Sequence, residues 1–333
     1  MHKTAFPSTL IAMAMLAGPA CATPVYLALG DSITFGETDL RYVQSSGDRG
    51  YVSLFADTLA ARNGGVRPTV VNLAIDGETA ASFQSNAGRT PPVAGRGDAP
   101  LQLENLNYGN STARPQSALF ASSVAAQHAA GNTIQAITVT LGFNELAALA
   151  PPTNDAAAEA AAVARIPATL DAYRISYTAV LNQVRSLAPE SQLYLLGYYN
   201  PFPADPASPA APIFNAGGTA LNGVIRSLAT QYGAAFVDTA TPFVGHEAEY
   251  TYQAAMPAGS TVDGPYGSVL PIGNVHPNAR GYAVIAAGVA SAPVPTPVPE
   301  PATWGMLLLG AAAGTLRLRS SGIRARRHRS SAG

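Results

Sequence analysis

The chain has 333 residues, of which 47% are hydrophobic and 12% are charged. This composition can bury a substantial core and excludes intrinsic disorder as the main state, because disorder requires low hydrophobicity and high net charge. Cys21 is the single cysteine, which excludes a disulfide scaffold. The formal charge of −1 is uneven: residues 22–299 hold 12 arginines and 19 acidic residues, whereas residues 317–329 hold six arginines and no acid. A basic nucleic-acid surface on the folded part is therefore not expected.

Residues 1–22 have the pattern of a secretory signal peptide. Two basic residues at positions 2 and 3 precede an apolar run over residues 10–17 and the small-x-small site Ala20-Cys21-Ala22. The apolar run is too short to span a bilayer. A lipoprotein signal with Cys21 as the lipidated residue is the alternative, but the preceding Gly-Pro pair fits it poorly. Cleavage after Ala22 leaves a chain without cysteine, which excludes a Cys nucleophile and a Cys-bound metal.

Five apolar, β-branched segments follow at long intervals and are separated by segments of helical character. The strand candidates are residues 25–29, 69–73, 134–141, 192–197 and 235–237. Among the helix candidates, residues 51–62 end at an Asn-Gly-Gly stop signal, and residues 169–187 carry apolar side chains at three- and four-residue spacing. This alternation predicts a parallel sheet that helices cover on both faces.

Two segments do not fit this alternation of strands and helices. Residues 84–116 and 238–274 are rich in Gly, Pro, Asn and Ser, and both are long for plain connections. Long loops in compact domains often form lids or binding walls, so we expect these two segments to line a substrate pocket.

Chemically useful residues follow the predicted strands. Ser32 comes after the first strand in Gly30-Asp31-Ser32, Gly77 after the second and Asn144 after the third, and His276 precedes the last predicted helix. An isolated Gly-Asp-Ser is more often a helix N-cap than a nucleophile. In open parallel sheets, however, ligands bind beyond the carboxyl ends of the strands, where these four residues are expected to meet.

The order and spacing of these blocks resemble the SGNH, or GDSL-type, hydrolase family, over residues 24–290 of a domain placed at 23–291. The resemblance implies a flavodoxin-like three-layer α/β/α sandwich with a parallel sheet of about five strands. It also implies Ser32 as nucleophile, His276 as general base and an oxyanion hole made by Ser32, Gly77 and Asn144. Such a site needs neither a cofactor nor a metal, because the base activates the hydroxyl and the donors stabilise the oxyanion.

Two positions depart from the family pattern. The family usually carries Asp three residues before the catalytic His, where this chain has Gly273. An Asp at this position orients the imidazole, so three alternatives stay open: a dyad held by a backbone carbonyl, orientation by Asn274 or Asp263, or reduced activity. The family also carries Asp after the oxyanion Asn; Glu145 stands there and is expected to conserve the charge.

Competing motifs are weaker. His246-Glu247 begins like a zinc-protease helix, but Tyr250 occupies the position of the second His. His246 is a rival for the general base, although it lacks the His-Pro-Asn context of His276, and His128 is expected on a helix surface. The chain also lacks the Gly-x-Ser-x-Gly elbow, a phosphate-binding loop and a dinucleotide fingerprint.

The C-terminal region is the last predicted segment. A Pro-rich linker over residues 292–301 precedes fifteen uncharged residues at 302–316 and then an arginine cluster. Residues 298–329, which include Val298-Pro299-Glu300-Pro301, resemble the PEP-CTERM sorting signal of Gram-negative bacteria. The resemblance implies an exosortase-type membrane enzyme as partner and transient membrane insertion of the apolar segment; a buried C-terminal helix is the alternative.

These observations predict an esterase that is exported across the inner membrane of a Gram-negative bacterium to the periplasm, cell surface or extracellular matrix. Its substrate is a short-chain acyl ester or an acetylated polysaccharide, and no nucleic acid is involved. The alternative is a surface or matrix-binding protein that keeps the hydrolase fold with little or no activity, as the Gly273 substitution would allow.

Overall fold

The computed structural model describes residues 22–36, 50–75, 77–85, 114–152, 154–251, 262–264, 267–269 and 276–295. The predictions for residues 1–21 and 296–333 lie outside this part of the chain. Within the described residues, no helix is both long and apolar enough to cross a membrane.

The centre of the fold is a five-stranded parallel sheet with the strand order β2-β1-β3-β4-β5. Its strands are β1 (Pro24–Gly30), β2 (Thr69–Asn72), β3 (Thr133–Thr140), β4 (Gln192–Leu196) and β5 (Ala235–Val237). Each lies within a residue or two of the segment that the sequence predicts. A separate antiparallel pair is formed by β6 (Val262–Gly264) and β7 (Gly267–Val269). The predicted flavodoxin-like three-layer architecture is confirmed.

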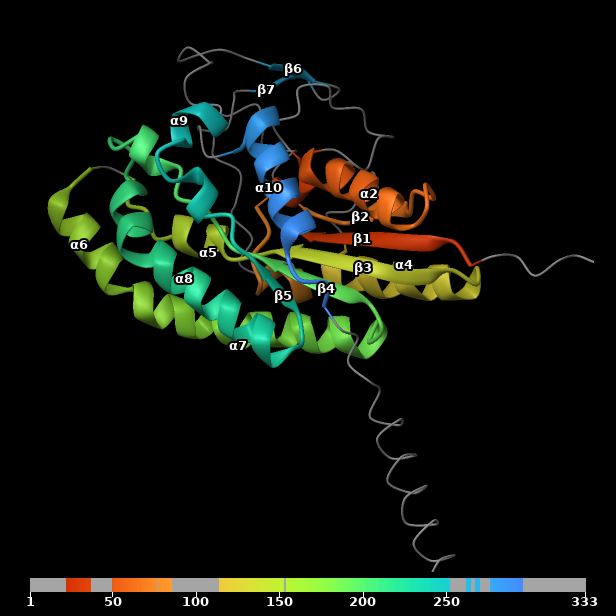
Figure 1. Cartoon of the computed structure of the whole chain (residues 1–333). Coiled ribbons are helices and arrows are strands. Elements are labelled where there is room, and N and C mark those ends of the chain that lie inside the picture. The colour runs from red at the N-terminus through yellow and green to blue at the C-terminus, as the bar shows by residue number, and fades with distance from the viewer. Residues whose placement is uncertain are drawn as a thin grey trace, which may run out of the picture.

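Helices cover both faces of the sheet. Figure 1 shows α2 (Gly50–Arg62) and α10 (Ala279–Ser291) on one face, and α4 (Gln116–Ala129), α7 (Ile166–Leu187) and α8 (Ala211–Gln231) on the other. The shorter helices are α1 (Ser32–Phe35), α3 (Ser82–Ser85), α5 (Phe143–Ala147), α6 (Ala156–Ala164) and α9 (Glu247–Tyr250), with 3-10 turns η2 (Phe202–Ala204) and η3 (Thr241–Phe243). Most of them follow the carboxyl ends of strands, which is where the site forms.

The length of α7 shows how local sequence sets these elements. It begins at Ile166, three residues before the predicted start, because Pro167 lies in its first turn, where a missing N–H costs nothing. Its buried face carries the predicted apolar side chains Leu170, Tyr173, Tyr177, Val180, Leu181 and Val184. The preceding helix α6 is N-capped by Asp155, whose carboxylate accepts the Ala158 N–H at 2.8 Å.

Tyr173 and Tyr177 provide a matched pair for a stability test. Their rings stack at 5.2 Å and both are buried, but the Tyr173 hydroxyl donates to the Leu141 carbonyl at 2.6 Å, whereas the Tyr177 hydroxyl bonds to no described residue. Since an unsatisfied buried hydroxyl is costly, we expect Tyr177→Phe to raise the free energy of unfolding by about 1 kcal/mol and Tyr173→Phe to lower it by about 1 kcal/mol. Urea denaturation measures both; equal destabilisation by the two substitutions would contradict the assignment.

Candidate active site

A sharp turn joins β1 to the single-turn helix α1, and Ser32 comes directly after this turn. Asp31 is the N-cap of α1, and its carboxylate accepts the Ile33 N–H at 3.0 Å. Ser32 is therefore the first helical residue rather than the cap, and its side chain is buried at 7% exposure. Gly30 has φ +137°, and a Cβ there would lie 2.3 Å from the Thr140 carbonyl oxygen, so the turn requires glycine.

The Asp31 carboxylate anchors this turn to the sheet. It accepts hydrogen bonds from the Tyr198 hydroxyl at 2.5 Å and from the Thr140 hydroxyl at 3.1 Å. Burial raises the pKa of Asp31 to about 6, against the lowering effect of these bonds. Sequence reasoning missed Tyr198 and Thr140, although Thr140 ends β3 and Tyr198 follows β4 by two residues. The rule that found Ser32 and Asn144 applies equally to them.

His276 lies in contact with Ser32, although the two residues are far apart in the sequence. Its Nε2 lies 2.8 Å from Ser32 Oγ, across a sequence separation of 244 residues, and the imidazole is 5% exposed. For Nε2 to accept the Ser32 proton, the neutral ring must carry its own proton on Nδ1.

Asn278 fixes the backbone that carries His276. It caps α10 by accepting the Arg280 and Gly281 N–H groups at 2.9 and 3.1 Å. Its own amide donates to the Glu249 carbonyl at 2.7 Å, and its N–H donates to the Tyr250 carbonyl at 2.8 Å. The His-Pro-Asn sequence thus joins the start of α10 to α9, and this places His276 over Ser32.

The residue that orients the imidazole stays a prediction. Gly273 and Asn274 lie outside the described residues. The backbone of Asp263 belongs to β6, but its side chain lies outside the described part as well.

The rival base, His246, is placed differently. Its Nδ1 lies 3.0 Å from Glu249 Oε2, its ring stacks on Tyr250 at 5.2 Å, and half of its side chain is exposed. His128 is exposed near the end of α4, as predicted. Among the described residues no group of three or more His, Cys, Asp or Glu side chains is arranged to hold a metal ion.

Two of the three predicted oxyanion donors, Gly77 and Asn144, lie on neighbouring segments. Gly77 is buried with φ +70° in the turn after β2, and Asn144 is the second residue of α5. The Asn144 amide donates to the Glu78 carbonyl at 2.9 Å, which brings the two segments together. An amide has two N–H donors, and the second bonds to no described residue. The N–H groups of Ser32 and Gly77 also have no hydrogen-bond acceptor among the described residues.

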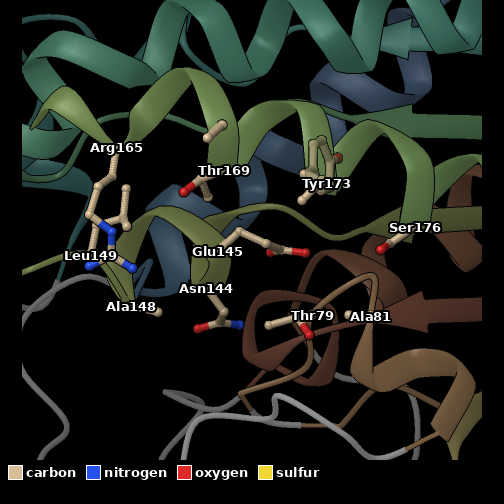
Figure 2. A pocket seen from close by; sticks show the side chains of 12 residues that line it. Thr79, Ala81, Asn144, Glu145, Ala148, Leu149, Arg165, Thr169, Tyr173 and Ser176 are labelled. Carbon is tan, nitrogen blue, oxygen red and sulfur yellow. The ribbon is translucent and has the colours of Figure 1, made fainter. Parts of the chain in front are cut away.

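A cavity of about 430 Å³ opens beside Asn144 (Figure 2). Its mainly apolar lining comes from the turn after β2, from α5 and its C-terminal end, and from the first half of α7. The lining residues are Thr79, Ala81, Asn144, Glu145, Ala148, Leu149, Arg165, Ala168, Thr169, Ala172, Tyr173 and Ser176. None of them belongs to segments 84–116 and 238–274, which were expected to form the pocket wall. Much of both segments lies outside the described residues, so for those positions the expectation is untested.

Glu145 does not behave as the sequence suggested. Its Oε1 accepts the Ala80 N–H at 2.7 Å, while its Oε2 is buried and bonds to no described residue. Burial raises the pKa of Glu145 to about 7, so the charge expected at this position is only partly present near neutral pH. The side chain extends from α5 toward α7 and the turn of Thr79 (Figure 2).

The Glu145 pKa predicts a pH-dependent stability. With a raised pKa, the folded state binds this proton more tightly than the unfolded state, so the free energy of unfolding falls as pH rises from about 4.5 to about 7. We expect Glu145→Gln to reduce this fall by an amount on the order of 2 kcal/mol. Urea unfolding at pH 4.5 and pH 8 measures the difference, with the exposed Glu190→Gln as control. An unchanged pH dependence in Glu145→Gln would contradict the buried carboxyl.

The sheet and the residues gathered at its carboxyl edge define an SGNH-type hydrolase fold. The model of the GDSL-like lipase/acylhydrolase family matches residues 28–284, so the chain belongs to that family and is a carboxylic ester hydrolase. Comparison with curated protein sequences gave no match.

Three solved structures are similar to this chain. Phospholipase A1 from Streptomyces albidoflavus NA297 is 18% identical with a TM-score of 0.49, over 81% of this chain and 99% of that one. An extracellular lipase from Streptomyces rimosus is 23% identical with a TM-score of 0.48, over 81% of this chain and all of that one (100%). An acetylxylan esterase from Geobacillus stearothermophilus is 18% identical with a TM-score of 0.45, over 80% and 93% of the two chains.

Proposed function

We propose that this ester hydrolase is an exported serine esterase in which Ser32 and His276 form the catalytic dyad. The observation that carries the proposal is the 2.8 Å contact between His276 Nε2 and Ser32 Oγ, two buried groups from opposite ends of the domain. A serine hydroxyl is a weak nucleophile until a neighbouring base can take its proton, and this contact supplies that base.

In the proposed acylation step, Ser32 Oγ attacks the ester carbonyl carbon while its proton moves to His276 Nε2. The carbonyl oxygen becomes an oxyanion, and the proposed donors to it are the N–H groups of Ser32 and Gly77 and the Asn144 amide. Each of these groups retains a donor that no described residue uses. His276 then gives the proton to the alcohol oxygen as the ester bond breaks, and the alcohol leaves.

Deacylation follows the same steps, with water as the nucleophile. His276 Nε2 takes a proton from water, the hydroxide oxygen attacks the acyl carbon, and the same three donors bind the second oxyanion. The proton returns to Ser32 Oγ as the acyl–serine bond breaks, which releases the carboxylic acid and restores the dyad.

The cavity beside Asn144 supports a small or medium-sized substrate group next to the reacting carbonyl. Its wall of alanine, leucine and tyrosine side chains suits an apolar acyl chain, and Arg165, Thr169 and Ser176 offer polar contacts. The proposed substrates are therefore short-chain acyl esters and O-acetyl esters of polysaccharides.

Export belongs to the same proposal and is supported by the sequence alone. The N-terminal pattern of residues 1–22 directs the chain across the inner membrane. The tail of residues 298–329 engages an exosortase-type enzyme and inserts transiently into the membrane, so the hydrolase acts in the periplasm, at the cell surface or in the extracellular matrix.

Turnover of defined esters tests the proposal. The purified protein is assayed on nitrophenyl esters of increasing acyl length and on acetylated xylan, and we expect hydrolysis of the short esters, of acetylated xylan, or of both. No turnover of either class would favour the alternative of a binding protein that retains the fold.

A further inference from the structure

A buried glutamine lies between the segments that carry two of the proposed oxyanion donors. Gln116 is the first residue of α4 and is fully buried. Its Oε1 accepts the Gly30 N–H at 2.7 Å, and its Nε2 donates to the Gly30 carbonyl at 2.9 Å. One side-chain amide thus satisfies both backbone groups of the residue two positions before Ser32.

The same amide reaches the second donor segment. Gln116 Nε2 lies 3.1 Å from Glu78 Oε2, and Glu78 is also fully buried. Glu78 immediately follows Gly77, its other carboxylate oxygen accepts a hydrogen bond from the Ser82 hydroxyl, and its carbonyl accepts from the Asn144 amide. A continuous set of hydrogen bonds therefore runs from Gly30 through Gln116 and Glu78 to Asn144.

From these contacts we infer that Gln116 is a positioning residue that fixes the distance between the Ser32 and Gly77 N–H groups. The inference rests on the proposed Ser32 mechanism and deepens it. Gln116 touches no reacting atom; it acts on the backbone at Gly30 and through the Glu78 carboxylate. Since oxyanion stabilisation depends on preorganised donors, a shift of either segment lowers the rate of the chemical step more than substrate binding.

Hydrogen-bonding chemistry makes this link directional. A glutamine offers a donor to Glu78 and both a donor and an acceptor to Gly30, whereas a glutamate at position 116 offers acceptors alone when ionised. Gln116→Glu keeps the shape of the side chain but loses both donated hydrogen bonds. It also places a second buried carboxyl group beside that of Glu78. Adding Glu78→Gln restores a donor–acceptor pair between the two positions with the roles exchanged.

The test compares kcat, KM and transition-state binding in these variants, with kcat referred to titrated active sites. We expect Gln116→Glu to lower kcat about 10- to 100-fold with KM changed less than threefold. We expect the affinity for an alkyl boronic acid, which forms a tetrahedral adduct on serine, to fall with kcat. The double variant Gln116→Glu with Glu78→Gln is expected to recover about tenfold in kcat. Gln116→Met, which removes the bonds without adding a carboxyl group, lowers kcat in the same direction and serves if Gln116→Glu fails to fold.

Gln183→Glu is the matched control. Gln183 is a partly buried residue on α7, and its side-chain amide donates to the carbonyl of Ser117 at 3.0 Å. Ser117 directly follows Gln116 in the sequence, but this bond is not part of the hydrogen bonds that link Gln116 to Glu78. The kcat of Gln183→Glu is expected to stay within twofold of the parent. The inference is overturned if kcat per active site in both Gln116 variants stays within threefold of the parent, or if the double variant recovers nothing. Ser32→Ala, assayed in parallel, separates this outcome from failure of the mechanism: retained turnover in Ser32→Ala refutes the proposed nucleophile itself.

Discussion

Replacing Ser32 with alanine is expected to lower kcat by about four to six orders of magnitude, the largest effect of any single substitution in the chain. The variant lacks the oxygen that forms the acyl–enzyme, so hydrolysis is left to water with oxyanion stabilisation alone. The Asp31 cap of α1 and its bonds to Tyr198 and Thr140 do not involve the Ser32 side chain, so the turn is expected to keep its shape.

Ser191→Ala is the matched control for this experiment. Ser191 is as buried as Ser32, donates to the Ala188 carbonyl at 2.8 Å, and lies before β4 at the opposite edge of the sheet. Ser191→Ala is expected to lower the free energy of unfolding by about 1 kcal/mol and to leave kcat unchanged. Turnover of a nitrophenyl acetate by purified Ser32→Ala above about one-hundredth of the parent value would contradict the assignment.

Replacing His276 with alanine is the second large effect. We expect kcat to fall by about four orders of magnitude or more, because Ser32 then has no group to take its proton. The vacated volume beside Ser32 Oγ is the size of an imidazole ring, so added imidazole is expected to restore part of the rate. A double variant with Ser32→Ala should lose little more than either single variant, since the two residues act as a unit.

His246→Ala distinguishes the two candidate bases. His246 is paired with Glu249 and stacked on Tyr250, so its removal is expected to leave kcat within about twofold of the parent. Loss of turnover in His246→Ala, with turnover retained in His276→Ala, would assign the base to His246 instead. Steady-state kinetics on one nitrophenyl ester compares both variants under the same conditions.

Much of the fold follows from local patterns in the sequence. The apolar, β-branched runs mark all five strands of the parallel sheet, the Asn-Gly-Gly stop signal marks the end of α2, and the spacing of apolar residues marks most of α7. Because parallel strands present their carboxyl ends at one edge, the residues after β1, β2 and β3 could be assigned to a common site. Predicting that His276 contacts Ser32 also required the resemblance of the four sequence blocks to a known family.

The residues that hold the site in place through hydrogen bonds could not be predicted in the same way. Tyr198, Thr140 and Gln116 are ordinary residues by composition, and they matter because tertiary packing buries them against Asp31, Gly30 and Glu78. Gln116 stood at the end of a segment interpreted as a long loop, whereas it is the first residue of α4. The Glu145 pKa likewise depends on burial in the folded chain, which no local pattern encodes.

Active-site labelling of Ser32 tests the central claim most directly. The protein is treated with a fluorophosphonate, which phosphonylates an activated serine, and the modified peptide is identified by mass spectrometry. The Ser32–His276 contact predicts one phosphonyl group on Ser32, no label in Ser32→Ala and much slower labelling in His276→Ala. Label on a different residue, or no label on a folded protein, would contradict the proposed dyad.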